Sequence, residues 1–132
     1  MKKRTRNTTT FTGPSEADEQ ALLFEWMDYA TVKYPELILA YHIPNEGRRS
    51  LRGGYELKRQ GMRKGVPDIC LPFSNGRYHA MYIEMKRLRD GRVSDEQRWW
   101  NKRLNEAGNK AVVCKGFDEA RQAILDYLAG KD

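Results

Sequence analysis

The chain has 132 residues and a mass of 15.4 kDa, which is the size of one domain and leaves no room for a second. Hydrophobic residues make up 39% and charged residues 32% of the sequence, so a compact domain with a highly charged surface is expected rather than wholesale disorder. A formal net charge of +6 favours polyanions as partners. The sequence contains no apolar stretch of 18 or more residues, which argues against a membrane span and against export. Cys70 and Cys114 lack the spacing of a zinc site or a disulfide framework, so a reducing cytoplasm is the expected location.

Basic and acidic residues are segregated along the chain. Residues 1–14, 44–64 and 86–103 together contain 18 of the 24 lysines and arginines. Residues 15–43, by contrast, contain six acids and a single base, Lys33. Residues 1–14 have little to bury and are expected to form a flexible basic arm, followed by a single folded domain over 15–132.

In chain order, apolar periodicity and turn residues predict eight elements in the order αβαββαβα. Ser15 and Ser94 each begin a capping-box pattern, which marks the start of a helix. Gly61 is expected to end the second helix, and Ser74-Asn75-Gly76 is expected to form a hairpin turn. The predicted helices cover 16–33, 55–60, 94–108 and 118–128, and the predicted strands cover 37–43, 69–73, 78–86 and 110–114. This order favours an α/β fold with a mixed sheet of about four strands covered by helices on both faces.

Charged residues interrupt two of the predicted apolar runs. Asp68 precedes the strand over 69–73, while Glu84 and Lys86 lie within the strand over 78–86. Alternate side chains of a strand share a face, so Glu84 and Lys86 project together. If the two strands pair, two carboxylates and an ammonium converge, which is the inventory for holding Mg²⁺ and activating water. The Met85 carbonyl is a possible further metal ligand, and the pattern indicates a metal-dependent phosphodiesterase.

These motifs resemble the virus-type replication-repair nuclease (VRR-NUC) branch of the PD-(D/E)XK nuclease superfamily. The resemblance covers residues 15–128 and implies a restriction-endonuclease-like fold. It rests on Ser15-Glu16 with Gln20, Ile43-Pro44-Asn45-Glu46-Gly47, Leu57-Lys58-Arg59-Gln60-Gly61, Gly65-Val66-Pro67-Asp68, Ile83-Glu84-Met85-Lys86, Ser94-Asp95-Glu96-Gln97 with Trp100, and Ala107-Gly108.

The resemblance assigns roles to individual residues. It implies that Asp68 and Glu84 bind Mg²⁺, for which Mn²⁺ can substitute, and that Lys86 acts on the nucleophilic water. A glutamate of the first helix completes the metal site in such nucleases; Glu16 fits the spacing best and Glu19 is the fallback. Gln97 would line the active site, although a glutamine at this position of a capping box can instead bond to the Ser94 amide.

The resemblance also implies partners. Related single-domain nucleases are phage or bacterial homodimers that cut branched DNA such as four-way (Holliday) junctions, in the cytoplasm of a bacterial or phage-infected cell. No small-molecule cofactor is expected. A cluster of bases close to the site would hold phosphates: Arg48, Arg49, Arg52, Lys58, Arg59, Arg63, Lys64 and Arg87.

Three alternatives stay open at this stage. The acids could be surface charge on a non-catalytic nucleic-acid-binding domain. The enzyme could instead be a restriction-type nuclease that reads a short sequence. Trp99 and Trp100 diverge by about 100° on a helix, so one is expected in the core and the other near the surface, where it could stack on a base or pack in a dimer.

Overall fold

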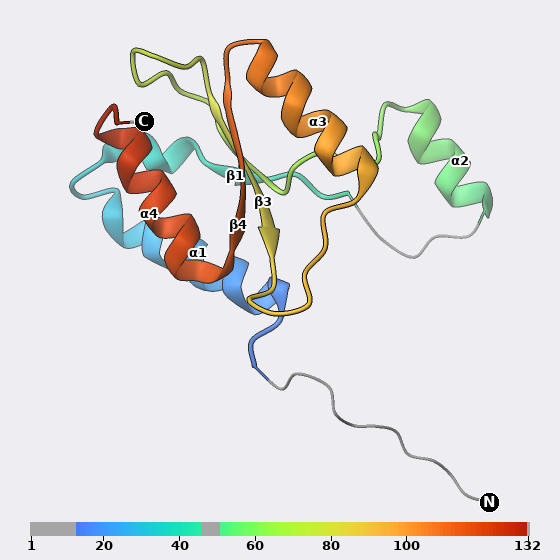
Figure 1. Ribbon diagram of the computed structural model, residues 1–132, viewed down its shortest axis with the longest axis horizontal. Coiled ribbons are helices and arrows are strands. Elements are labelled where there is room, and N and C mark those ends of the chain that lie inside the picture. Colours follow the sequence, from blue (N-terminus) through green and yellow to red (C-terminus); the bar gives the residue numbers. More distant parts are fainter. Residues whose placement is uncertain (1–12, 46–50, 132) are drawn as a thin grey trace, which may run out of the picture.

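The computed structural model describes residues 13–45 and 51–131, with the backbone alone for 51 and 52. Within these ranges a mixed four-stranded sheet is flanked by helices on both faces, as Figure 1 shows. The fold class and the element order are therefore as predicted. The elements are α1 (Glu16–Ala30), the 3-10 helix η1 (Pro35–Leu39), β1 (Tyr41–His42), α2 (Leu51–Arg59), β2 (Ile69–Leu71), β3 (Met81–Lys86), α3 (Asp95–Glu106), β4 (Lys110–Lys115) and α4 (Gly116–Leu128).

The sheet brings the two charged segments side by side. Its strand order is β1-β2-β3-β4, with β2 antiparallel to both β1 and β3 and with β3 parallel to β4. Ile69 of β2 lies opposite Ile83 of β3, so the same register carried one residue further sets Asp68 opposite Glu84. Pairing of these two strands is the condition that the predicted site required.

The hydrophobic core lies between one face of the sheet and the adjacent helices α1 and α4 (Figure 1). Met81, Ile83 and Met85 alternate along β3, and each is fully buried on this face. They belong to one cluster with Leu23 of α1 and Ile124 of α4. Each such side chain contributes about 1.5–3 kcal/mol on full burial. Because strand residues alternate, Glu84 and Lys86 are directed to the opposite face.

Helix α3 lies along that opposite face and is attached to the sheet edge. The Asn105 side chain donates to the Ala111 carbonyl and accepts from the Ala111 amide, both at 3.0 Å. These two bonds occupy the outer edge of β4, which would otherwise be free to pair with another strand. At its other end α3 packs against Gly65, in the segment that leads into β2.

The helix caps form as predicted. Ser15 and Ser94 accept hydrogen bonds from the amides of Asp18 and Gln97, and both capping boxes are complete. Gly61 has a φ of +110°, and the Met62 amide donates to the Leu57 carbonyl at 2.9 Å, which closes the end of α2.

Several element boundaries differ from those predicted. Residues 37–39 belong to η1 rather than to a strand, because Pro35 starts the 3-10 helix and only Leu37 of its apolar run turns into the core. Helix α1 ends at Ala30 rather than at Lys33, and α2 starts at Leu51 and includes both Gly53 and Gly54.

The connection between β2 and β3 is also longer than the predicted hairpin turn. Phe73 and Tyr78 leave the sheet to pack on the Tyr127 ring, and the Tyr127 hydroxyl donates to the Phe73 carbonyl at 2.6 Å. The contact with α4 thus replaces further strand pairing over 72–80.

No helix within the described residues is long and apolar enough to cross a membrane. The arm predicted over 1–14 lies outside the described residues except for Gly13 and Pro14.

We predict that Gly65→Ala destabilises the fold far more than Gly61→Ala. Both glycines have positive φ, but a Cβ at Gly65 would lie 2.6 Å from the Glu96 Cβ and 2.7 Å from its backbone carbon, whereas a Cβ at Gly61 meets nothing within 4 Å. Urea denaturation should show a loss of roughly 2–5 kcal/mol for Gly65→Ala and of about 1–2 kcal/mol for Gly61→Ala. Equal losses would mean that α3 is not held closely against this segment.

Candidate active site

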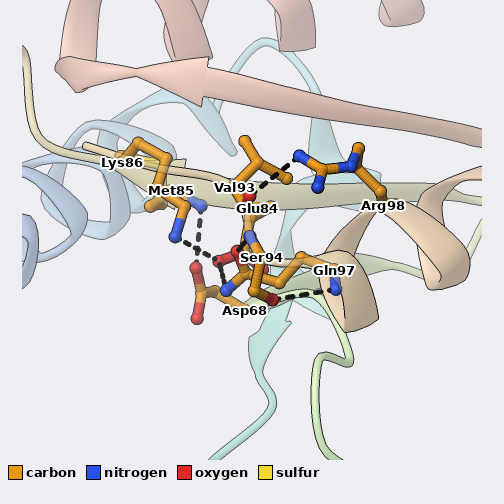
Figure 2. Close-up of polar contacts among 8 residues, drawn as sticks. All are labelled: Asp68, Glu84, Met85, Lys86, Val93, Ser94, Gln97 and Arg98. Carbon is orange, nitrogen blue, oxygen red and sulfur yellow. Dashed lines mark hydrogen bonds and ion pairs between the residues drawn. The ribbon is translucent and has the colours of Figure 1, made fainter.

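Asp68 and Glu84 form a pair of carboxylates across β2 and β3 (Figure 2). The Asp68 side chain is half-buried, and its Oδ2 accepts a hydrogen bond from the Met85 amide at 2.7 Å. That bond ties the Asp68 carboxylate to β3, just before β2 begins. The pair is therefore built into the sheet rather than carried on a flexible loop.

Glu84 is the most constrained group of the site, with only 5% of its surface exposed. Its Oε2 accepts a hydrogen bond from the Gln97 amide nitrogen at 2.8 Å and lies 3.6 Å from Lys86 Nζ. Its Oε1 is buried and has no hydrogen-bond partner within the described part of the chain. One oxygen is thus held by the protein while the other is left without a partner.

Gln97 fills both of the roles between which the sequence left a choice. Its Oε1 accepts from the Ser94 amide at 2.9 Å, which completes the capping box, while its Nε2 donates to Glu84. The cap fixes the glutamine side chain in the orientation that meets Glu84 (Figure 2). Arg98, in the first turns of α3, donates to the carbonyl of Val93 in the preceding loop at 2.9 Å.

Lys86 is 7% exposed and lies at the end of β3, beside Glu84. The loop after β3 returns over its stem, so that a Cβ at Gly91 would lie 3.0 Å from the Lys86 Cβ. This close approach leaves the long side chain little freedom. Its ammonium is directed toward the carboxylate pair.

The pKa values of Asp68 and Glu84 reflect two carboxyl groups that are held close together and are poorly solvated. Burial, and then the neighbouring Asp68 carboxylate, raise the pKa of Glu84 to about 8. Burial also raises the pKa of Asp68 above its usual value, although the Met85 amide opposes this rise. Both shifts mean that charging the pair costs free energy in the absence of a counter-ion.

The two candidate glutamates of the first helix, Glu16 and Glu19, make different contacts. Glu16 is half-buried at the start of α1; burial raises its pKa, Lys86 lowers it and Asp68 raises it, so it lies within the field of the site. Glu19 is buried, and its Oε1 accepts from the Phe117 amide at 2.7 Å. Glu19 therefore supports the start of α4, where the chain has no side-chain cap of its own.

His42 is a neighbour of the site that the sequence did not single out. Its Nδ1 lies 2.8 Å from the Asp68 carbonyl oxygen, and the electrostatic influence of its ring lowers the pKa of Asp68. The contact depends on the pairing of β1 with β2, which local sequence does not reveal.

Those of the predicted phosphate-binding residues that the structure describes lie on α2, on the segment before Asp68 and after β3. Arg59 pairs with Glu56 at 3.2 Å and Lys64 with Glu96 at 3.8 Å, and both cations remain largely exposed. Arg87 is half-buried, and its charge lowers the pKa of Glu16. Lys58 and Arg63 are exposed, Arg48 and Arg49 lie outside the described residues, and so does the Arg52 side chain.

The donor set fits a hard divalent cation. Carboxylate oxygens are the ligands that Mg²⁺ prefers, and it commonly uses one or two of them and keeps several waters. The buried Glu84 Oε1 lacks any other partner, as a ligand oxygen would. No group of three or more His, Cys, Asp or Glu residues gathers closely enough to hold a metal within 13–45 and 51–131, so Asp68 and Glu84 are the carboxylates already in place and Glu16 is not gathered with them.

Comparison with known proteins supports the same class of protein. The VRR-NUC domain model matches residues 16–118, and the chain belongs to this nuclease-type family. A solved structure described as a VRR_NUC domain protein is 25% identical, with a TM-score of 0.77 over 92% of this chain and 94% of that one. No curated protein is similar enough to count as a relative.

We predict that Glu84→Gln stabilises the protein in EDTA at pH 8. The Glu84 pKa is raised from 4.5 to about 8, so the stability associated with its neutral form is present below pH 4.5 and is lost as the pH rises toward 8. The variant should gain about 2–4 kcal/mol at pH 8 and less than about 1 kcal/mol at pH 5. Thermal and urea unfolding at both values would measure this difference.

The matched control is Glu36→Gln, which replaces an exposed carboxylate on η1. It should leave the dependence of stability on pH close to that of the wild type. A Glu84→Gln variant that unfolds like the wild type at both pH values would contradict the proposed repulsion within the acid pair.

Proposed function

We propose that the protein is a Mg²⁺- or Mn²⁺-dependent DNA endonuclease that hydrolyses phosphodiester bonds, with a preference for branched DNA such as four-way junctions. Membership of a nuclease-type family supports hydrolysis of nucleic acid in general. The metal, the substrate geometry and the oligomeric state go beyond that membership and are part of the proposal.

One observation carries the catalytic assignment. A glutamate buried in a sheet holds one oxygen against a lysine and a glutamine while its other oxygen has no partner within the described residues. An unpaired buried carboxylate oxygen destabilises a fold. A structural ion pair would need no second acid, yet Asp68 lies across from Glu84 and raises its pKa. A cation site accounts for both features.

In this proposal Asp68 and Glu84 hold the divalent cation, with Glu16 and the Met85 carbonyl as further candidate ligands. When bound, the ion neutralises charge on the phosphate and makes water more acidic. The Met85 amide orients Asp68, and Gln97 orients Glu84. Lys86 Nζ would donate a hydrogen bond to the attacking water or to the phosphate oxygens that gain charge. The water oxygen forms a new P–O bond, the P–O bond to the leaving oxygen breaks, the water gives up a proton to solvent, and the leaving oxygen takes up a proton from solvent.

The cations around the site suit a polyanionic substrate. Lys58, Arg59, Arg63 and Lys64 precede Asp68 along the chain and are exposed, and together they would contact phosphates near the scissile bond. Their ion pairs with Glu56 and Glu96 are at the surface, where such pairs contribute little, so phosphate can replace the carboxylates.

A homodimer follows from the geometry of the substrate in this proposal. One small domain offers one acid pair, whereas symmetric cutting of a junction needs two sites related by a twofold axis. The dimer is proposed for this reason alone.

We predict that Lys86→Ala lowers the cleavage rate by roughly 100-fold or more, because it removes a donor to the reacting phosphate or water. Cleavage of labelled DNA would be followed with Mg²⁺, with Mn²⁺ and with EDTA, and EDTA should abolish it. Lys131→Ala, which removes an exposed lysine beyond α4, is the control and should cut at the wild-type rate.

Two outcomes of this assay separate the alternatives. Unchanged cutting by Lys86→Ala would contradict the assigned site. DNA binding without cleavage by the wild-type protein under any of the metal conditions would favour a non-catalytic nucleic-acid-binding domain.

We further predict that the protein cuts four-way junctions faster than linear duplexes and does so as a dimer. Junction, flap, splayed and linear substrates of the same sequence would be compared at one enzyme concentration, and light scattering would give the mass in solution. Cutting tied to a short sequence in linear DNA would instead identify a restriction-type nuclease, and a monomer that cuts junctions symmetrically would contradict the dimer.

A further inference from the structure

A shallow pocket of about 380 Å³ lies between α3 and the segment that leads into β2. It is lined by the two adjacent tryptophans of α3 and by residues of the segment that leads into β2. The lining residues are Arg63, Lys64, Glu96, Trp99 and Trp100. Neither tryptophan is buried, in contrast to the expectation that one would enter the core, and Trp99 is 54% exposed. Trp100 is half-buried, whereas the exposed face of Trp99 has no packing role in the described part of the chain.

The pocket is held in shape by specific contacts. The Trp100 indole donates to the Lys64 carbonyl at 3.0 Å, which fixes the ring against the segment that leads into β2. The Trp99 ring lies edge to face with the Trp100 ring, with centroids 5.4 Å apart and planes at 85°. The close approach of Gly65 to Glu96 fixes the same segment on α3. The aromatic surface is therefore organised before any ligand arrives.

We propose that this pocket binds an unpaired nucleobase of the DNA substrate by stacking on Trp99, while Arg63 and Lys64 contact the adjacent phosphates. The inference rests on the proposed nuclease function and specifies which DNA the site prefers. An aromatic face beside cations is the arrangement that binds single-stranded nucleic acid without reading its sequence. Junctions, flaps and bulges provide such bases, whereas continuous duplex does not.

The expected strengths of the two interactions favour a stacked base over the cation–π contact that Arg103 makes with Trp99. The Arg103 guanidinium lies 5.5 Å from the centroid of the Trp99 ring. A cation–π contact of this exposed kind shifts an equilibrium by about 2- to 5-fold, whereas stacking of one base is equivalent to about 5- to 150-fold. A base can therefore displace Arg103, which then remains near the phosphates. The exposed ion pair between Lys64 and Glu96 is equally easy to exchange.

The residues that line the pocket are close in the chain to Gln97 and Asp68 of the candidate active site. Gln97, which holds Glu84, precedes Trp100 by three residues on α3, so the two lie on neighbouring turns of the same helix face. Lys64 precedes Asp68 by four residues, which span at most about 14 Å. A base held in the pocket would belong to a nucleotide close to the scissile phosphate.

The test is DNA binding in EDTA, followed by Trp fluorescence and by anisotropy of labelled DNA. The probes are a duplex with three unpaired thymidines, the same duplex with three abasic residues in their place, and a fully paired duplex. We expect Trp99→Ala to bind the unpaired thymidines about 5- to 100-fold more weakly than wild type and to bind the paired duplex equally well. Abasic residues should weaken binding by the wild type but not by Trp99→Ala, because the abasic DNA keeps its phosphates and lacks only the bases.

Two variants act as controls. Trp99→Phe keeps an aromatic face and should recover most of the affinity for the unpaired bases. Tyr29→Ala removes an aromatic residue of α1 that is 83% exposed and should bind all three probes as the wild type does. Circular dichroism would verify that each variant is folded.

Equal binding of thymidine and abasic probes by the wild type would overturn the proposal, as would a Trp99→Ala variant that loses the same affinity for every probe. A change of mass in Trp99→Ala, together with binding that does not depend on the bases, would identify the pocket as a contact between two copies of the chain and would also overturn the proposal.

Parallel cleavage assays distinguish failure of the base-binding proposal from failure of the proposed nuclease function. Normal cutting with binding that ignores the bases contradicts only the pocket, and base-dependent binding without cutting contradicts only the nuclease.

Discussion

The placement of the Glu84 carboxylate in the middle of a buried sheet is the constraint on which the site depends. Its strand must be apolar on one face to pack on α1 and α4, and the same alternation directs Glu84 and Lys86 to the other face. Burial and the nearby Asp68 raise the pKa of Glu84 to about 8, so the fold holds this acid at a cost. The hydrophobic core on the opposite face offsets that cost. Packing and chemistry are thus divided between the two faces of one strand.

Helix α3 makes that division possible, because separate contacts along this one helix attach it to different parts of the fold. Asn105 bonds to the edge of β4, Glu96 packs against Gly65, and Gln97 reaches Glu84. One Gln97 side chain makes both contacts, because its amide oxygen caps the helix while its amide nitrogen is directed at Glu84. The orientation of the Gln97 side chain is therefore set by local helix geometry and needs no further packing. One conformation of Gln97 therefore makes both the cap and the bond to Glu84.

The sequence predicted the features that depend on local pattern and on the motif, and it missed those that depend on distant contacts. Both capping boxes, the mixed sheet and the convergence of Asp68 with Glu84 and Lys86 follow from short strings of residues. The strand predicted over 37–43 was wrong in its first half because Pro35 and a single buried leucine favour a 3-10 turn there. The bond from the Phe117 amide to Glu19 joins residues 98 positions apart, and local sequence carries no signal for it. The contacts of Glu16 and Glu19 could therefore be distinguished only in the structure.

The arrangement also separates the buried acid pair from the exposed side chains of α3 and of the segment before β2. Glu84 and Lys86 are buried in the sheet and Asp68 is half-buried beside it, so substitutions there alter the stability of the fold as well as the geometry of the site. Arg63, Lys64 and Trp99 are exposed on α3 and on the segment before β2, where most substitutions cost little stability. Yet Gly65 and the Trp100 indole fix this outer layer to the same helix that carries Gln97. The surface that would select DNA can therefore change its side chains without moving the group that orients Glu84, provided that Gly65 and Trp100 are kept.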